Sequence, residues 1–137
     1  KTFKYHGAEH KTIACYEAEL ELTVENVRKQ IRFHPRCGTS FIFLVVLLSI
    51  IIGMFLPWKN LWARFGLQLL MLIPETSIGY ELIKLAGRYD NIFTRIISAP
   101  GIWLQHITTC EPDDPQIEVA IAALKPCIPE NKEDDKW

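Results

Sequence analysis

The sequence predicts a mainly α-helical fold, a membrane-associated helical hairpin joined to cytoplasmic helices that carry a metal site. Three observations predict it. Apolar runs fill residues 41–58 and about 61–85, and two histidines near the N-terminus are spaced one helical turn apart. Of the 137 residues 49% are hydrophobic, and the mean hydropathy of +0.09 is high for a chain in which 23% of residues are charged. The apolar residues are therefore concentrated in segments.

The first expected element is a helix over residues 3–20 that contains His6-Gly7-Ala8-Glu9-His10, the inverted form of the zinc-protease helix motif. Its two histidines share a helix face, so both imidazoles can reach one tetrahedral ion. Glu9 lies beside that face and could act as general base in metal-assisted hydrolysis. Glu17 is about 10 Å along the axis from His10, so we expect an outer contact of the site or a solvated charge. The alternative is an exposed helix whose histidines face water.

Thr23 is expected to cap a short helix over residues 24–32, which a turn then separates from the first apolar run. In this turn His34 and Cys37 are three residues apart, a spacing that lets both side chains reach a common metal ion. The alternative is a proline turn in which Cys37 packs as a small apolar group. Both interpretations remain open at this stage.

The apolar run from Phe41 to Leu56 is interrupted only by Ser49 and Gly53, and Trp58 follows it as a residue type favoured at membrane interfaces. Its length approaches the roughly 20 residues that cross a bilayer core. The alternative is a buried core helix, which a chain of this size could hardly cover on every side. We therefore expect a membrane span here.

The second apolar stretch is interrupted by Pro74, Glu75 and Glu81, so the helix should either kink or leave the lipid in its second half. Carboxylates at membrane depth usually face a polar cavity or a partner and are candidates for a functional site. Glu81 could equally be a solvated residue at the interface. Transport through so few spans would require a homo-oligomer or further helices.

The positive charges favour a cytoplasmic location of both long arms. Seven Lys and Arg residues precede residue 41 and six follow residue 83, whereas Lys59 and Arg64 alone lie between the apolar segments. The formal net charge of −1 and the lack of a basic stripe argue against a nucleic-acid partner. The four cysteines all fall in the arms, where cytoplasmic thiols stay reduced. We expect a lipid bilayer as the partner.

Beyond the hairpin, residues 92–107 suit either an interfacial helix on the membrane, with Trp103 at the lipid boundary, or a helix that covers a soluble core. Pro100-Gly101 is expected to break it. Asp114 should cap a last helix that runs to Lys125. Residues 1–125 are thus predicted to form one membrane-associated domain, followed by a disordered acidic tail over residues 126–137.

Several blocks, taken in order, resemble the bacterial YqhQ family over nearly the whole chain. The resemblance implies a multi-span membrane protein that is described as a metal-dependent enzyme, with further sequence upstream. The matching blocks are YHGAEHK (5–11), YE (16–17), HPRCGTSF (34–41), YE (80–81), LAGR (85–88), EPDD (111–114) and EVAIAAL (118–124).

These patterns together predict a zinc-dependent membrane hydrolase acting on a peptide or lipid-linked substrate. His6 and His10 would bind the divalent ion and Glu9 would be the base. Glu81 as third ligand would leave a position for water, whereas His34 and Cys37 would close the coordination sphere. The second case is typical of a noncatalytic membrane scaffold or assembly factor with a structural metal site.

Overall fold

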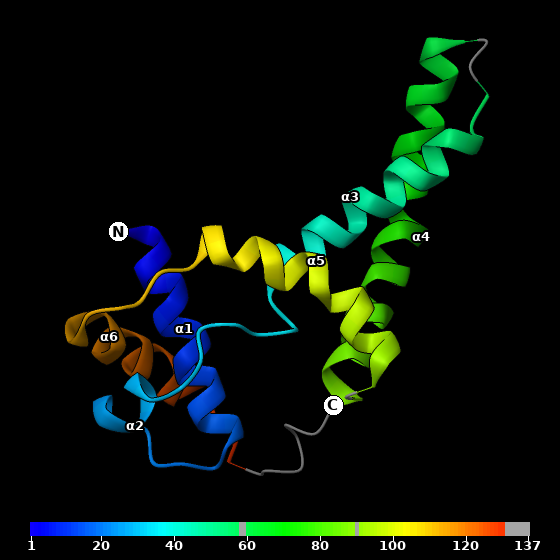
Figure 1. The fold of residues 1–137 in the computed structure, drawn as a ribbon. Helices are drawn as coiled ribbons and strands as arrows, with labels where there is room; N and C mark the ends of the chain where they lie inside the picture. The colour runs from blue at the N-terminus through cyan, green and yellow to red at the C-terminus, as the bar shows by residue number, and fades with distance from the viewer. Residues whose placement is uncertain (58–59, 90, 131–137) are drawn as a thin grey trace. The chain divides into compact units, whose positions relative to one another are not determined.

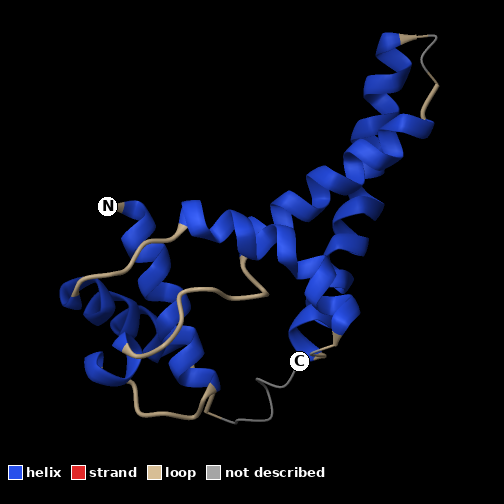
Figure 2. Cartoon of the chain, in the orientation of Figure 1, coloured by secondary structure: helices blue, strands red, loops and turns tan. Residues whose placement is uncertain are grey.

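The computed structural model describes residues 1–57, 60–89 and 91–130, and all regular elements within these ranges are helical, which confirms the mainly α-helical class (Figure 2). The chain divides into two compact units. We call Lys1–His34 with Ile102–Trp137 the terminal unit, and Pro35–Gly101 the central unit. That residues 1–125 form a single domain stays a prediction. The elements are α1 (Thr2–Glu17), α2 (Val24–Arg28), α3 (Gly38–Phe55), α4 (Leu61–Arg88), α5 (Ile92–Thr108), α6 (Asp114–Leu124) and a 3-10 turn, η1 (Lys125–Cys127) (Figure 1).

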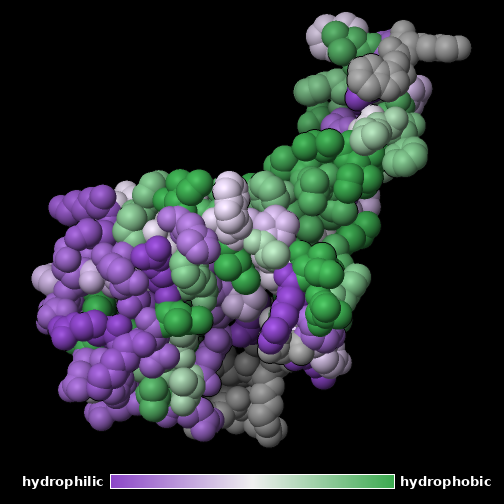
Figure 3. All heavy atoms as spheres, in the orientation of Figure 1, coloured by the Kyte–Doolittle hydropathy of each residue, from purple (hydrophilic) through white to green (hydrophobic). Residues whose placement is uncertain are grey.

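In the terminal unit α1, α2 and α6 pack around a small core (Figure 1). Ala8 and Cys15 of α1, Val27 of α2 and Ile117 of α6 are completely buried, and Ile121 is nearly so. The side chains are small or branched, so three short helices can approach closely around them. Hydrophilic residues cover much of the visible surface of this unit (Figure 3).

The motif helix ends at Glu17, three residues before the predicted end. Glu19 adopts a left-handed backbone with φ of 55°, and the amides of Glu19 and Leu20 donate to the carbonyls of Tyr16 and Cys15 at 2.9 and 3.1 Å. This is the hydrogen-bond pattern of a Schellman motif. No local pattern predicted this motif, because glycine usually occupies the left-handed position.

The caps of the other two helices follow the sequence closely. The Thr23 hydroxyl accepts from the amide of Asn26, which confirms the cap, although α2 ends at Arg28 and not at residue 32. The cap of α6 is Asp113, one residue before the prediction. The Gln116 side chain accepts from the Asp113 amide at 2.8 Å, as in a capping box.

The acidic residues of the EPDD block, at the start of α6, form ion pairs with basic residues of α1, of α2 and of the segment after α2. The sequence analysis missed this role of the block, because the paired residues are about 80 to 110 positions apart. Exposed pairs contribute little, so the pair that involves the nearly buried Lys11 should matter most. The ion pairs are Lys4–Asp113 (2.7 Å), Lys11–Glu111 (2.7 Å), Arg32–Glu111 (3.5 Å) and Arg28–Asp114 (2.6 Å).

In the central unit α3 and α4 pack side by side (Figure 1). Of the described residues, α3 alone is long and apolar enough to cross a membrane. Its buried residues are Ser40 and Gly53, and large hydrophobic side chains cover its exposed surface (Figure 3). The predicted interface residue Trp58 lies outside the described residues. By length and composition α4 does not qualify as a second span, since charged and polar residues interrupt it.

The second apolar stretch forms one continuous helix through Pro74. Proline cannot donate an amide hydrogen, so the carbonyl of Leu70, four residues earlier, loses its helical donor. The Thr76 hydroxyl donates to the carbonyls of Leu72 and Ile73 at 2.8 and 2.9 Å, and Ser77 donates to Ile73 at 2.9 Å, the usual bonding of these side chains to the preceding helix turn. In the same way α5 continues through Pro100, so the predicted break at Pro100-Gly101 is wrong.

A polar seam runs between α3 and α4. Glu75 is completely buried and accepts hydrogen bonds from Ser49 and, at 3.4 Å, from Gln68. Gln68 also donates to the Ser49 carbonyl at 3.3 Å, and Arg64 donates to the Gly53 carbonyl at 3.1 Å. The buried carboxylate of Glu75 therefore has polar partners on both helices, Ser49 of α3 and Gln68 of α4.

Candidate metal centre

His6 and His10 of α1 lie next to each other, as their spacing predicts. Their ring centroids are 4.4 Å apart, and the ring planes meet at 70°. Two imidazoles bound to one tetrahedral zinc ion have centroids about 5 Å apart, given Zn–N bonds of about 2 Å. The pair therefore has close to the separation that a shared ion requires. Gly7, which follows His6 in the motif, is buried, because the Cys110 carbonyl lies against its backbone.

Both rings are oriented by backbone carbonyls of the terminal unit. Nδ1 of His6 donates to the Thr108 carbonyl at 2.9 Å, and Nδ1 of His10 donates to the Arg32 carbonyl at 2.7 Å. A carbonyl oxygen only accepts, so each neutral ring carries its hydrogen on Nδ1 and its lone pair on Nε2. Metal-binding histidines are commonly held in this way through the nitrogen that does not bind the ion.

His34 is the third imidazole of the cluster. It is buried, and its ring centroid lies 6.0 Å from that of His10. Its Nε2 lies 3.1 Å from a carboxylate oxygen of Glu17. Glu17 thus contacts a histidine of the cluster, and its outer role at a metal site stays a prediction.

Gln105 of α5 fixes the backbone of His34, a role that the sequence analysis missed. The Gln105 side chain is completely buried. Its amide nitrogen donates to the His34 carbonyl at 2.8 Å, and its oxygen accepts from the His34 amide at 2.9 Å. Seventy-one positions separate the two residues, so no local spacing could have indicated the contact.

The remaining predicted site residues are Glu9, Cys37 and Glu81. Glu9 is exposed on α1. Cys37 belongs to the central unit, where it is buried and its Sγ lies 3.0 Å from Thr39 Oγ1. Glu81 is an exposed residue of α4, also in the central unit. Their roles as base and as ligands stay predictions. His106 is exposed and stacks on Phe33 at 4.4 Å.

The imidazoles of His6 and His10 are donors that zinc prefers, and the backbone carbonyls on their Nδ1 atoms are contacts of the kind that orient such ligands. By contrast, burial raises the pKa of the Cys15 thiol, and its Sγ contacts the Glu21 carbonyl at 3.6 Å. Cys15 is therefore a core residue. All four cysteines carry free thiols.

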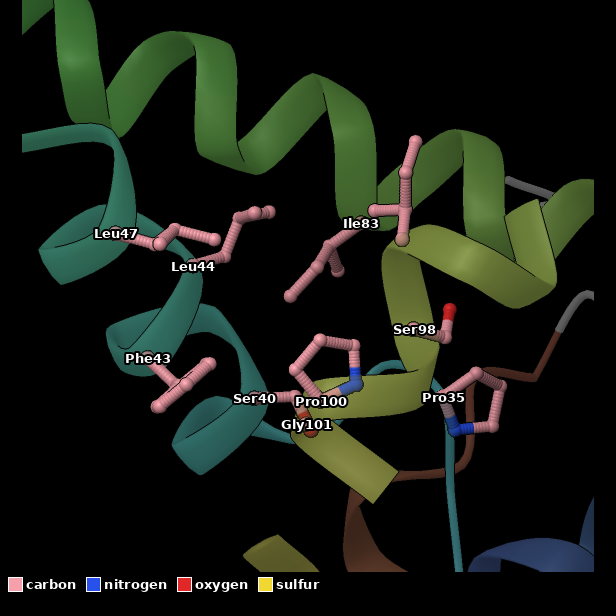
Figure 4. A pocket seen from close by; sticks show the side chains of 10 residues that line it. Pro35, Ser40, Phe43, Leu44, Leu47, Ile83, Ser98, Pro100 and Gly101 are labelled. Carbon is pink, nitrogen blue, oxygen red and sulfur yellow. The ribbon is translucent and has the colours of Figure 1, made fainter. Parts of the chain in front are cut away.

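The central unit contains a small apolar pocket between α3, α4 and α5 (Figure 4). Ser40 and Ser98 supply the polar groups of its wall, and none of the lining residues is titratable. The pocket therefore offers no acid, base or metal ligand. Its lining residues are Pro35, Ser40, Phe43, Leu44, Leu47, Ile83, Ile97, Ser98, Pro100 and Gly101.

Comparison with known proteins places the chain in a family. A family model described as a protein of unknown function (DUF1385) matches residues 1–130. The chain belongs to this family. It is 43% identical over 125 residues to a protein from Bacillus subtilis (strain 168) that is described as uncharacterized protein YqhQ. This confirms the resemblance to the YqhQ family. The alignment covers 90% of this chain and 39% of that relative, and no solved structure matches the chain.

Proposed function

We propose that this DUF1385 chain is a zinc-dependent hydrolase of the bacterial inner membrane, acting on a peptide or lipid-linked substrate. One observation supports metal binding most strongly. Both histidines of the H-x-x-E-H motif donate from Nδ1 to a backbone carbonyl, which directs the lone pair to Nε2 in each ring. If the two histidines only faced water, we would not expect both rings to be held in this way.

His6 and His10 are the first two ligands in this proposal, and His34 is the third candidate because it already lies beside His10. Three protein ligands would leave one position for water, the arrangement of catalytic zinc sites. Cys37 follows His34 by three residues and remains a candidate for the fourth position, as does Glu81 for the third. The variants described below separate these cases.

Zinc, when bound, supplies Lewis-acid activation of water near neutral pH. The chain's own contribution to the reaction would come from Glu9, whose carboxylate would accept a proton from the attacking water. Glu9 is exposed, so a substrate could approach it. The exposed apolar surface of α3 supports a membrane location, where a lipid-linked or membrane-bound peptide substrate would be concentrated.

A second candidate function is a noncatalytic scaffold or assembly factor with a structural metal site. The burial of His10 and His34 favours it, since structural sites are closed to solvent. The three histidines also connect α1 with the segment before α3, and a bound metal would stabilise that connection. In a scaffold, removal of the metal should unfold this part of the protein.

Elemental analysis of the full chain, purified in detergent without chelator, tests metal binding. We expect zinc in the wild-type protein, loss of zinc in His6→Ala and His10→Ala, and retention in His106→Ala, the matched control for an exposed histidine. Absence of metal from the wild-type protein would contradict both candidate functions. Zinc retained in Cys37→Ala favours the open site, whereas its loss favours the closed one.

Glu9→Gln separates the enzyme from the scaffold. In the enzyme this change should leave the zinc content and the melting temperature unaltered but abolish turnover in a screen of peptide and lipid-linked substrates. Glu118→Gln, which changes an exposed glutamate of α6, is the control. If both variants keep the activity of the wild-type protein, the assignment of Glu9 as the base is wrong.

A further inference from the structure

One face of α5 exposes five large apolar side chains. Ile92, Phe93, Ile96, Trp103 and Ile107 are between 59% and 79% exposed. At about 100° per residue they fall within an arc of roughly 100° on the helix. A soluble helix normally turns such an arc toward the protein core.

The opposite face of α5 is buried although it is polar or made of small residues. Thr94 and Gln105 are almost completely buried and hydrogen-bonded, Thr94 to the Tyr89 carbonyl at 2.7 Å and Gln105 to His34. Gly101 is buried against Ser40, whose side chain lies where a Cβ of residue 101 would be. The polarity of α5 is therefore reversed relative to a helix that borders water. The hydrogen bonds of the buried face hold the apolar face outward.

This reversed polarity favours a lipid environment around the apolar face of α5. In the central unit α3 also exposes large apolar side chains, and α5 begins only four residues after α4 ends. The sequence of α5 contains no acidic residue, while Arg95 and His106 lie on one border of the apolar arc. Cationic residues beside an apolar stripe complement the anionic headgroups of a bacterial membrane.

We propose that α5 lies in the surface of an anionic bilayer, with Ile92, Phe93, Ile96, Trp103 and Ile107 inserted among the acyl chains. Of the two roles that the sequence left open for residues 92–107, the proposal takes the interfacial helix. The proposal rests on the proposed membrane location of α3 but is independent of the metal site. Because α5 also carries Gln105 and Thr108, the histidine cluster would lie within about one or two helix turns of the lipid-bound stretch.

Collision measurements on spin labels test the proposal. The full chain, with Cys110 and Cys127 replaced by serine, is labelled at one introduced cysteine and reconstituted in vesicles of phosphatidylcholine with phosphatidylglycerol. Labels at Ile96 and Ile107 should collide more often with oxygen, which concentrates in lipid, than with a water-soluble nickel chelate. The matched control is Val119 of α6, an aliphatic residue of similar exposure, at which the order should reverse.

A label at Ile50 of α3 reports separately on the membrane location of the hairpin. If Ile50 is in lipid while Ile96 and Ile107 behave like Val119, the proposal for α5 is overturned and the membrane location stands. If Ile50 is also in water, both are overturned. Protection of Ile96 from both reagents, with magnetic broadening between labels, would mean that a second copy of the chain covers α5 and would also overturn the proposal.

Discussion

Replacing Gln105 by methionine should loosen the segment that carries His34. Methionine has nearly the same length as glutamine but cannot hydrogen-bond to a backbone. The buried His34 amide and carbonyl would each lose the partner that Gln105 supplies at 2.9 and 2.8 Å. The change thus isolates the two hydrogen bonds from the packing of the side chain.

The expected cost follows from the number of groups left without a partner. A buried backbone group without a partner costs about 1–3 kcal/mol, so two such groups, with partial relaxation, cost about 2–4 kcal/mol. Since every 1.4 kcal/mol is tenfold in an equilibrium constant, local opening at His34 should become about 30- to 700-fold more frequent. If His34 binds the metal, zinc affinity should also fall by about 10- to 100-fold.

Hydrogen exchange read by mass spectrometry on the peptide that contains His34 measures this opening. The control is Leu104→Met, which changes a neighbouring, partly buried residue of α5 that has no side-chain hydrogen bond to lose. We expect faster exchange in Gln105→Met than in the control. Equal exchange in the two variants would refute the reasoning that the Gln105 amide holds His34 in place.

Three further changes test the packing of each unit. Gly7→Ala should lower the melting temperature, because the new Cβ would clash with the Cys110 carbonyl oxygen, whereas Gly66→Ala, with no neighbour within 4 Å, should raise it by removing glycine from a helix. A lower melting temperature in both would contradict this account. Cys15 should react with iodoacetamide far more slowly than the exposed Cys110, since burial raises the pKa of its thiol, and equal labelling by mass spectrometry would argue against its place in the core. Glu75→Ala should destabilise the hairpin by about 1–3 kcal/mol in detergent unfolding, while Glu75→Gln should cost less because an amide can keep a hydrogen bond; equal losses would mean that the seam contributes no hydrogen-bond energy.

The helices and the spacing of the motif could be predicted because they depend on neighbours within a few residues. The cap at Thr23, the apolar helix α3 and the adjacency of His6 and His10 follow from such local patterns. The errors occurred where a local signal was weak or was overridden. Glu19 adopts a left-handed conformation without being glycine, and Pro100 lies inside a helix that continues through it.

The sequence by itself determined which residues share a helix face, because the helical repeat is a property of the chain. Only the tertiary structure decided what each face meets. The carbonyls of Thr108 and Arg32 that orient His6 and His10, and the Gln105 side chain that holds His34, come from segments 22 to 102 positions away. The reversed polarity of α5 likewise became clear only once its buried face was known, since periodicity locates an apolar arc but does not say whether protein or solvent covers it.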